Sequence, residues 1–168
     1  MSRAWMQFRK YAVTNYNLLK TVHIISATLL FGTGLGTYFF MLRAVRSRNP
    51  QAIKVTAATV VLADWLFTTP AVVIQFVSGL LLMQRLHIAW TSPWALLVFA
   101  LFCFVGALWL PVVWIQIRLR DMLAHLRPGE PLPAIFLRRA RLWELLGYPA
   151  FGTMILIFAL MVYKPWIS

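Results

Sequence analysis

Four long stretches of the chain are apolar and almost free of charge, and they set the expected architecture. They cover about residues 18–41, 64–84, 93–116 and 146–163. A helix needs about 20 apolar residues to cross a hydrocarbon core of about 30 Å. The pattern therefore predicts an all-α fold, in which residues 18–168 form a bundle of four transmembrane helices. The composition agrees, since 61% of the residues are hydrophobic, against about 45–50% in a typical soluble domain.

Two flanking segments are expected to be helical without crossing the membrane. Residues 1–17 mix aromatic and basic side chains, which is typical of an interfacial helix that lies against lipid headgroups. Residues 51–63 make the second apolar run too long for one crossing. A carboxylate is favoured at the start of a helix by the exposed amides and the helix dipole. We therefore expect the second span to begin at Asp64, with residues 51–63 as a helical approach at the interface.

The formal net charge of +12 raises the question of a nucleic-acid partner. The basic residues lie almost entirely in the connections between the apolar runs, and these are too short to form a separate basic domain. No nucleic acid is therefore expected, and the bilayer is the expected partner. Four spans place ten Lys and Arg residues in the first and third connections, against six on the other side. The positive-inside rule then predicts cytoplasmic first and third connections, with both termini outside.

Few residues offer chemistry within the spans. The acids are Asp64, Asp121, Glu130 and Glu144, and the pattern places none of them in the middle of a span. A cation exporter of four spans normally needs such a carboxylate. The histidines remain as candidates. His23 lies near the outer edge of the first span, and the residues below it on the same helical face are mostly small, which leaves room for a flat ligand: Ala27, Leu30, Gly34 and Thr37.

His87 ends the second span on the same side of the membrane as His23, whereas His125 follows the third span on the opposite side. A metal held by two histidines would therefore lie between His23 and His87. Three basic residues on that side could pair with carboxylates of a bound molecule, or could simply reach the headgroups: Lys20, Arg85 and Lys164. The alternative for His23 is a structural interfacial histidine, bonded to a carbonyl or a serine. An ionisable residue within a membrane otherwise indicates function.

Gly32 and Gly36 form a G-x-x-x-G pair on the face of the first span opposite His23. Such pairs let a neighbouring helix approach closely. This face could pack against another helix of the same chain, a second copy or a membrane protein partner.

Four segments of the chain resemble a known family: LKTVHIISATLLFGTGLGTYFFMLRA, VLADWLFTTPAVVIQFVSGLLL, WLPVVWIQIRLRDM and YPAFGTMILIFALMVYKPW. Over about residues 18–166 the chain resembles the domain of unknown function 2269 family, which consists of predicted bacterial integral membrane proteins. It is more distantly similar to the group that holds the HemJ-type protoporphyrinogen oxidase and the membrane domain of copper-resistance protein D. This resemblance implies a multi-pass protein of the bacterial inner membrane, and with the charge distribution it implies periplasmic termini.

The HemJ pattern is matched at Val22-His23-Ile24, at Thr69-Pro70-Ala71 with Gly79, and at Tyr163-Lys164-Pro165. The lysine that HemJ proteins carry early in the third span is replaced here by Trp94 or Ala95.

The resemblance implies haem b or a related tetrapyrrole, with His23 as an axial ligand, His87 as the second ligand if there is one, and space at Gly34. Lys20, Arg85 or Lys164 would then bind the propionates. This hypothesis makes the protein a membrane oxidoreductase. The alternative is a non-catalytic subunit or assembly factor of a larger complex, which packs by its Gly32 and Gly36 face.

Overall fold

The structure is a computed structural model that describes residues 3–127 and 130–164, with side chains described from residue 15 onward. Within these ranges the chain forms helices and no strand: α1 (Arg3–Ser47), α2 (Pro50–Ala63), the π-helical turn η1 (Asp64–Thr68), α3 (Thr69–Arg85), α4 (Pro93–Ala124) and α5 (Ala134–Tyr163). Four stretches of the described chain are long and apolar enough to cross a membrane: Asn15–Ser47, Pro50–Arg85, Pro93–Ala124 and Ala134–Tyr163. The predicted all-α bundle with four spans is confirmed.

Local sequence signals explain where two of the long helices begin. The side chain of Asn49 accepts hydrogen bonds from the backbone N–H groups of Gln51 and Ala52, at 3.0 and 3.2 Å. The hydroxyl of Ser92 accepts one from the backbone N–H of Ala95 at 3.3 Å. A proline follows each of these caps, at the first helical position, where its missing N–H costs no hydrogen bond. Capping residue and proline together fix the starts of α2 and α4.

The prediction that Asp64 lies at the start of a helix was wrong, while the point at which the second span enters the membrane stays a prediction. Helix α2 begins at Pro50, and the chain continues through η1 into α3 without leaving the helical path. Asp64 is not a cap at a surface but a buried residue, which is accepted within the helix because other side chains donate hydrogen bonds to it. In η1 the backbone N–H of Thr69 bonds to the carbonyl of Asp64, five residues back. This wider turn directly precedes Pro70, whose ring would clash with a regular preceding turn.

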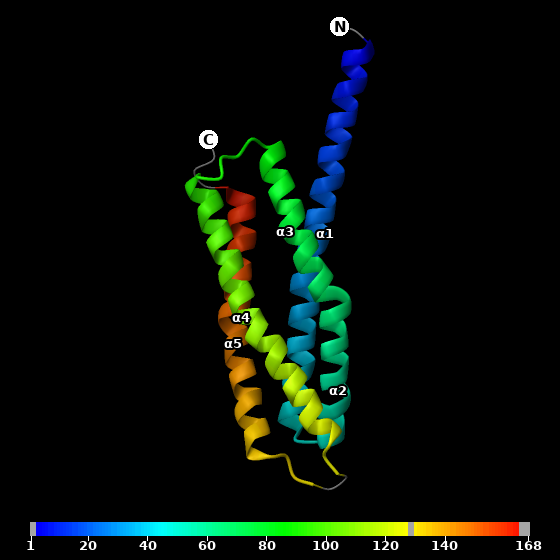
Figure 1. The fold of residues 1–168 in the computed structure, drawn as a ribbon, viewed down its shortest axis with the longest axis vertical. Coiled ribbons are helices and arrows are strands. Elements are labelled where there is room, and N and C mark those ends of the chain that lie inside the picture. The colour runs from blue at the N-terminus through cyan, green and yellow to red at the C-terminus, as the bar shows by residue number, and fades with distance from the viewer. Residues whose placement is uncertain (1–2, 128–129, 165–168) are drawn as a thin grey trace.

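The helices form two pairs, α1 with α3 and α4 with α5, and α2 packs against both α1 and α4 (Figure 1). The buried core lies mostly towards the end of the bundle that carries the first and third connections. Its members come from α1, α2, α4 and α5: Met41, Ala44, Ile53, Ala57, Val60, Ile115, Leu119, Leu123, Phe136, Ala140 and Trp143.

The connection between α3 and α4 and the end of α5 lie at the other end of the bundle, and the N-terminal part of α1 projects beyond them (Figure 1). The first, interfacial segment of the prediction therefore belongs to a continuous α1. Whether it lies against headgroups stays a prediction.

Candidate functional site

The middle of the bundle contains a buried polar chain, which we call the Asp64 cluster: Asp64, Thr68, Gln116 and Trp143. Asp64 is only 7% exposed. Its Oδ1 accepts a hydrogen bond from the hydroxyl of Thr68 at 2.8 Å, and its Oδ2 accepts one from the side-chain amide of Gln116. The indole N–H of Trp143 donates to Oε1 of Gln116 at 3.1 Å. These bonds join η1 to α4 and α4 to α5.

The Trp143 indole determines which groups donate and which accept the hydrogen bonds of the Asp64 cluster. An indole N–H can only donate, so the Gln116 oxygen must face it and the Gln116 amide nitrogen must face Asp64. Thr68 can donate to the other carboxylate oxygen. The cluster therefore offers hydrogen-bond donors to Asp64 from both sides, and these donors offset part of the cost of burying the carboxyl group. An acid inside the bundle was not predicted, because Asp64 had been placed at a helix start.

A second polar group, the His23 cluster, joins α1 to α3 and consists of His23, Ser26, Gln75 and Ser78. The ring nitrogen Nδ1 of His23 lies 2.8 Å from the hydroxyl of Ser78, and Nε2 lies 3.0 Å from the amide nitrogen of Gln75. The hydroxyl of Ser26 lies 2.5 Å from Oε1 of Gln75.

These contacts can be satisfied with the ring proton on either nitrogen. The Ser26 hydroxyl can donate to Oε1 of Gln75 or to the backbone carbonyl of His23, which lies 2.9 Å away. The Gln75 amide can accordingly donate to Nε2 of His23 or accept from it, and the Ser78 hydroxyl takes the matching role at Nδ1. Both ring nitrogens of His23 are thus engaged. Gly79 allows the close approach of the ring, since a Cβ there would lie 3.3 Å from Cε1 of His23.

A cavity of about 180 Å³ lies between the two helix pairs. The face predicted below His23 does line it, because Ala27, Leu30, Gly34 and Thr37 of α1 form part of its wall. Asp64, Thr68 and Gln116 contribute one polar part of the wall, and Gln75 contributes another. The cavity therefore touches both polar clusters, while the rest of its lining is largely aromatic and aliphatic.

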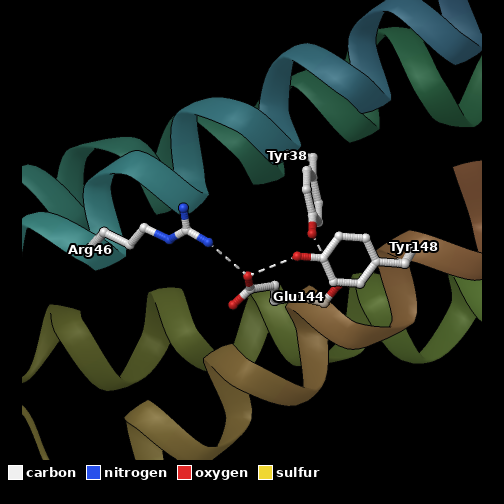
Figure 2. Close-up of polar contacts among 4 residues, drawn as sticks. All are labelled: Tyr38, Arg46, Glu144 and Tyr148. Atoms are coloured by element: carbon white, nitrogen blue, oxygen red, sulfur yellow. Dashed lines mark hydrogen bonds and ion pairs between the residues drawn. The ribbon is translucent and has the colours of Figure 1, made fainter.

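Tyr38 and Trp143, which also line the cavity, stack on each other with ring centroids 5.1 Å apart. Figure 2 shows how this part of the wall is held. The Tyr38 hydroxyl donates to the backbone carbonyl of Glu144, and both Arg46 and the hydroxyl of Tyr148 bond to Oε1 of Glu144, each at 3.1 Å. We call these four residues the α1–α5 clasp. They connect α1 with α5 and hold Tyr38, the member of the clasp that lines the cavity.

The other predicted site residues are not brought together with His23. Ser78 lies beside His23, and Arg85 is seven residues further along α3, about 10 Å along the helix axis. His87 follows the end of that helix, is exposed and has a positive φ of 54°. Lys20 is exposed, with its ammonium 6.0 Å from the ring of Tyr16 on its own helix. Lys164 ends α5 and is also exposed. His125 lies at the opposite end of the bundle, bonded to the carbonyl of Asp121.

In the structure as it stands, His23 is not free to ligate a haem iron. An axial ligand must present a free nitrogen lone pair to the iron, and both ring nitrogens of His23 are engaged, Nε2 by Gln75 and Nδ1 by Ser78. Among the described residues, no three of His, Cys, Asp and Glu are grouped in a way that could hold a metal ion. The cavity is also smaller than the roughly 300–1,000 Å³ that is usual for sites of drug-sized ligands. Iron ligation would require the His23 cluster to break.

The fold and the two buried clusters define a four-helix integral membrane protein with an internal cavity. Its sequence matches the model of a family of predicted integral membrane proteins over residues 17–165. The chain belongs to this family, domain of unknown function 2269 (DUF2269). No curated protein and no solved structure matches the chain.

Proposed function

We propose that the protein binds a small, largely apolar molecule in the cavity between its two helix pairs. The observation that supports this most is the wall itself: an apolar surface with a few convergent polar groups, Asp64, Gln116 and Gln75. Binding sites for small molecules have this composition and often lie between the helices of bundles. A buried carboxyl group within a membrane domain is costly, and such groups usually mark functional sites. The π-helical turn that presents Asp64 agrees, because such turns often occur at functional sites.

Filling the cavity tests this proposal. Gly106 lines the cavity, and a Cβ added there would meet nothing within 4 Å. Gly106→Leu should therefore occupy the cavity without displacing a neighbour at Cβ. Gly152→Leu is the matched control, since Gly152 is exposed and its Cβ would also meet nothing within 4 Å.

Small molecules released from the purified proteins would be compared by mass spectrometry. We expect a species that is retained by the wild type and by Gly152→Leu and is depleted at least about tenfold in Gly106→Leu. Equal amounts in all three proteins would overturn the proposal.

Haem b or a related tetrapyrrole, with a redox role, remains a second proposal. It is supported by the resemblance at His23 and by the small residues Ala27 and Gly34 on the cavity wall, and it requires His23 to leave Gln75. An absorption spectrum of protein purified from cells supplied with haem tests it. A Soret band that is lost in His23→Ala but kept in His125→Ala would support haem binding, and colourless wild-type protein would exclude it.

A further inference from the structure

The carboxyl group of Asp64 has no cationic partner among the side chains that the structure describes. Thr68 and Gln116, the two donors to its carboxylate, are both neutral. The ion pairs formed by described residues lie elsewhere: Arg46 pairs with Glu144, and Arg120 pairs with Asp121. A buried carboxyl group is stable in its ionised form when a cation lies beside it. Because Asp64 lines the cavity, the cavity is where that charge could be supplied.

The rest of the wall suits a cation rather than a neutral molecule. Six aromatic residues from α1, α4 and α5 line the cavity: Tyr38, Phe102, Trp109, Trp143, Phe151 and Phe158. The faces of aromatic rings carry partial negative charge and attract ammonium groups, most strongly where water is excluded. No Lys, Arg or His lies in the lining set of described residues. An aromatic wall with one carboxylate is the surface that recognises alkylated ammonium ions.

The volume of the cavity limits the size of a cation that it can hold. An engineered protein cavity of about 150 Å³ holds one benzene molecule. A cavity of about 180 Å³ should then hold a molecule only slightly larger, of about seven non-hydrogen atoms. Choline has this size and carries a quaternary ammonium group.

We propose that the cavity binds a small alkylammonium cation, with Asp64 as its counter-ion and the aromatic residues of α4 and α5 around its alkyl groups. This proposal rests on the ligand-binding cavity proposed above, and it adds the chemical class of the ligand. Gln116, held by Trp143, would keep the carboxylate turned towards the cavity.

The test compares choline with its neutral carbon analogue, 3,3-dimethyl-1-butanol, which has nearly the same shape without the charge. The full-length protein would be purified in a maltoside detergent, so that no choline headgroup is present. Binding of radiolabelled choline would be measured at equilibrium, with both unlabelled compounds as competitors. We expect choline to compete at least about tenfold better than the alcohol, which is the preference that desolvated cation–aromatic contacts provide.

Three variants locate the site. Asp64→Asn keeps the shape, because the asparagine oxygen can face Gln116 and its amide nitrogen can face the Thr68 hydroxyl. It should remove the preference for choline over the alcohol. Gly106→Leu should abolish the binding of both compounds, and Gly152→Leu should bind both as the wild type does. If Asp64→Asn fails to fold, the preference of the wild type for choline over the alcohol still decides whether the ligand is a cation.

The outcomes separate the two proposals. If both compounds bind equally and Gly106→Leu abolishes both, the ligand is not a cation, while the binding cavity stands. If neither compound binds the wild type, the cation proposal is overturned, and the co-purification experiment decides on the cavity independently. Choline binding that survives in Gly106→Leu would place it outside the cavity and would also overturn the proposal.

Discussion

The side-chain amide of Gln116 accepts a hydrogen bond from Trp143 and donates one to Asp64. Because it satisfies two partners at once, Gln116 is the least replaceable side chain of the Asp64 cluster. Gln116 is 2% exposed and bonds to both Asp64 and Trp143. A side chain without polar atoms would leave a carboxylate and an indole N–H unsatisfied at once. A buried group that loses its partner costs about 1–3 kcal/mol, and a charged group costs more.

Gln116→Met tests this at nearly constant volume. We expect it to lower the free energy of unfolding by about 2–4 kcal/mol, measured by denaturant titration in detergent. The double variant Asp64→Leu with Gln116→Met removes the charge as well, so it should be less destabilised than the sum of the two single variants. Additive losses would show that the two side chains do not interact.

The role of Asp64 could not be predicted from the sequence for a physical reason. Local patterns reveal where a helix can begin, and an acid beside an apolar run fits a cap. One partner of Asp64, Thr68, is local, but the other, Gln116, lies on α4, 52 positions away in the chain, and is itself held by Trp143 of α5. The face of small residues below His23 was predictable, because helical periodicity alone determines it. The engagement of both His23 nitrogens was not, since it depends on α3.

At the scale of helices, the close approach of Tyr38 on α1 to α5 depends on Gly147. A Cβ at Gly147 would lie 2.5 Å from Cε2 of Tyr38, closer than real atoms approach. Tyr38 is held from several sides, by the stack on Trp143, by the edge of Phe151 and by its bond to the Glu144 carbonyl. The ring therefore has little freedom to move away.

Gly147→Ala should force Tyr38 out of the α1–α5 clasp. We expect a loss of about 1–3 kcal/mol, as for other overpacked sites, seen as a lower thermal midpoint in detergent. Gly152→Ala is the matched control on the same helix and should change the midpoint little, because its Cβ would meet nothing within 4 Å. Equal midpoints for the two variants would contradict the predicted close contact.

The Gly32 and Gly36 face has no close neighbour among the described residues, since a Cβ at either position would meet nothing within 4 Å. The double variant Gly32→Leu with Gly36→Leu should therefore leave the stability of the monomer nearly unchanged, within about 0.5 kcal/mol. If the alternative of a packing subunit or homo-oligomer holds, the same variant should shift the mass measured by light scattering in detergent. Wild-type protein that is already monomeric, with no co-purified protein, would count against that alternative.

At the scale of the whole molecule, the number of spans was predictable because the bilayer demands long apolar runs and the chain supplies four of them. The four helical stretches are longer than the predicted spans. The apolar run of each stretch ends at the headgroups, but the helix can continue beyond them. Figure 1 shows the N-terminal part of α1, the α3–α4 connection and the end of α5 towards one end of the bundle. The comparison of basic residues on the two sides of the membrane assumes this arrangement.

The orientation itself remains a prediction. Ten basic residues against six favour a cytoplasmic position for the first and third connections. A reporter that is active only outside the cytoplasm, fused after Ser168 and expressed in a bacterium, should therefore be active. A reporter that works only in the cytoplasm should be inactive at the same position. The reverse result would invert the orientation and leave the four spans intact.

The hydrogen bonds between helices are unevenly placed along the bundle. Those of His23 with Gln75 and Ser78 lie within the α1–α3 pair, and the bond from Trp94 to the Leu160 carbonyl lies within the α4–α5 pair. Bonds that cross from one pair to the other come from the Asp64 cluster and the α1–α5 clasp. Nearer the chain ends the pairs meet through phenylalanine rings, such as Phe31 on Phe158 and Phe76 on Phe102.

Phenylalanine rings can shift against each other at a small cost in free energy, whereas hydrogen bonds weaken steeply when their geometry changes. The two helix pairs are therefore joined most firmly at the Asp64 cluster and the α1–α5 clasp, and least firmly where they meet through phenylalanine rings. Lateral pressure in the surrounding lipid would change the spacing of the two pairs mainly at that end of the bundle.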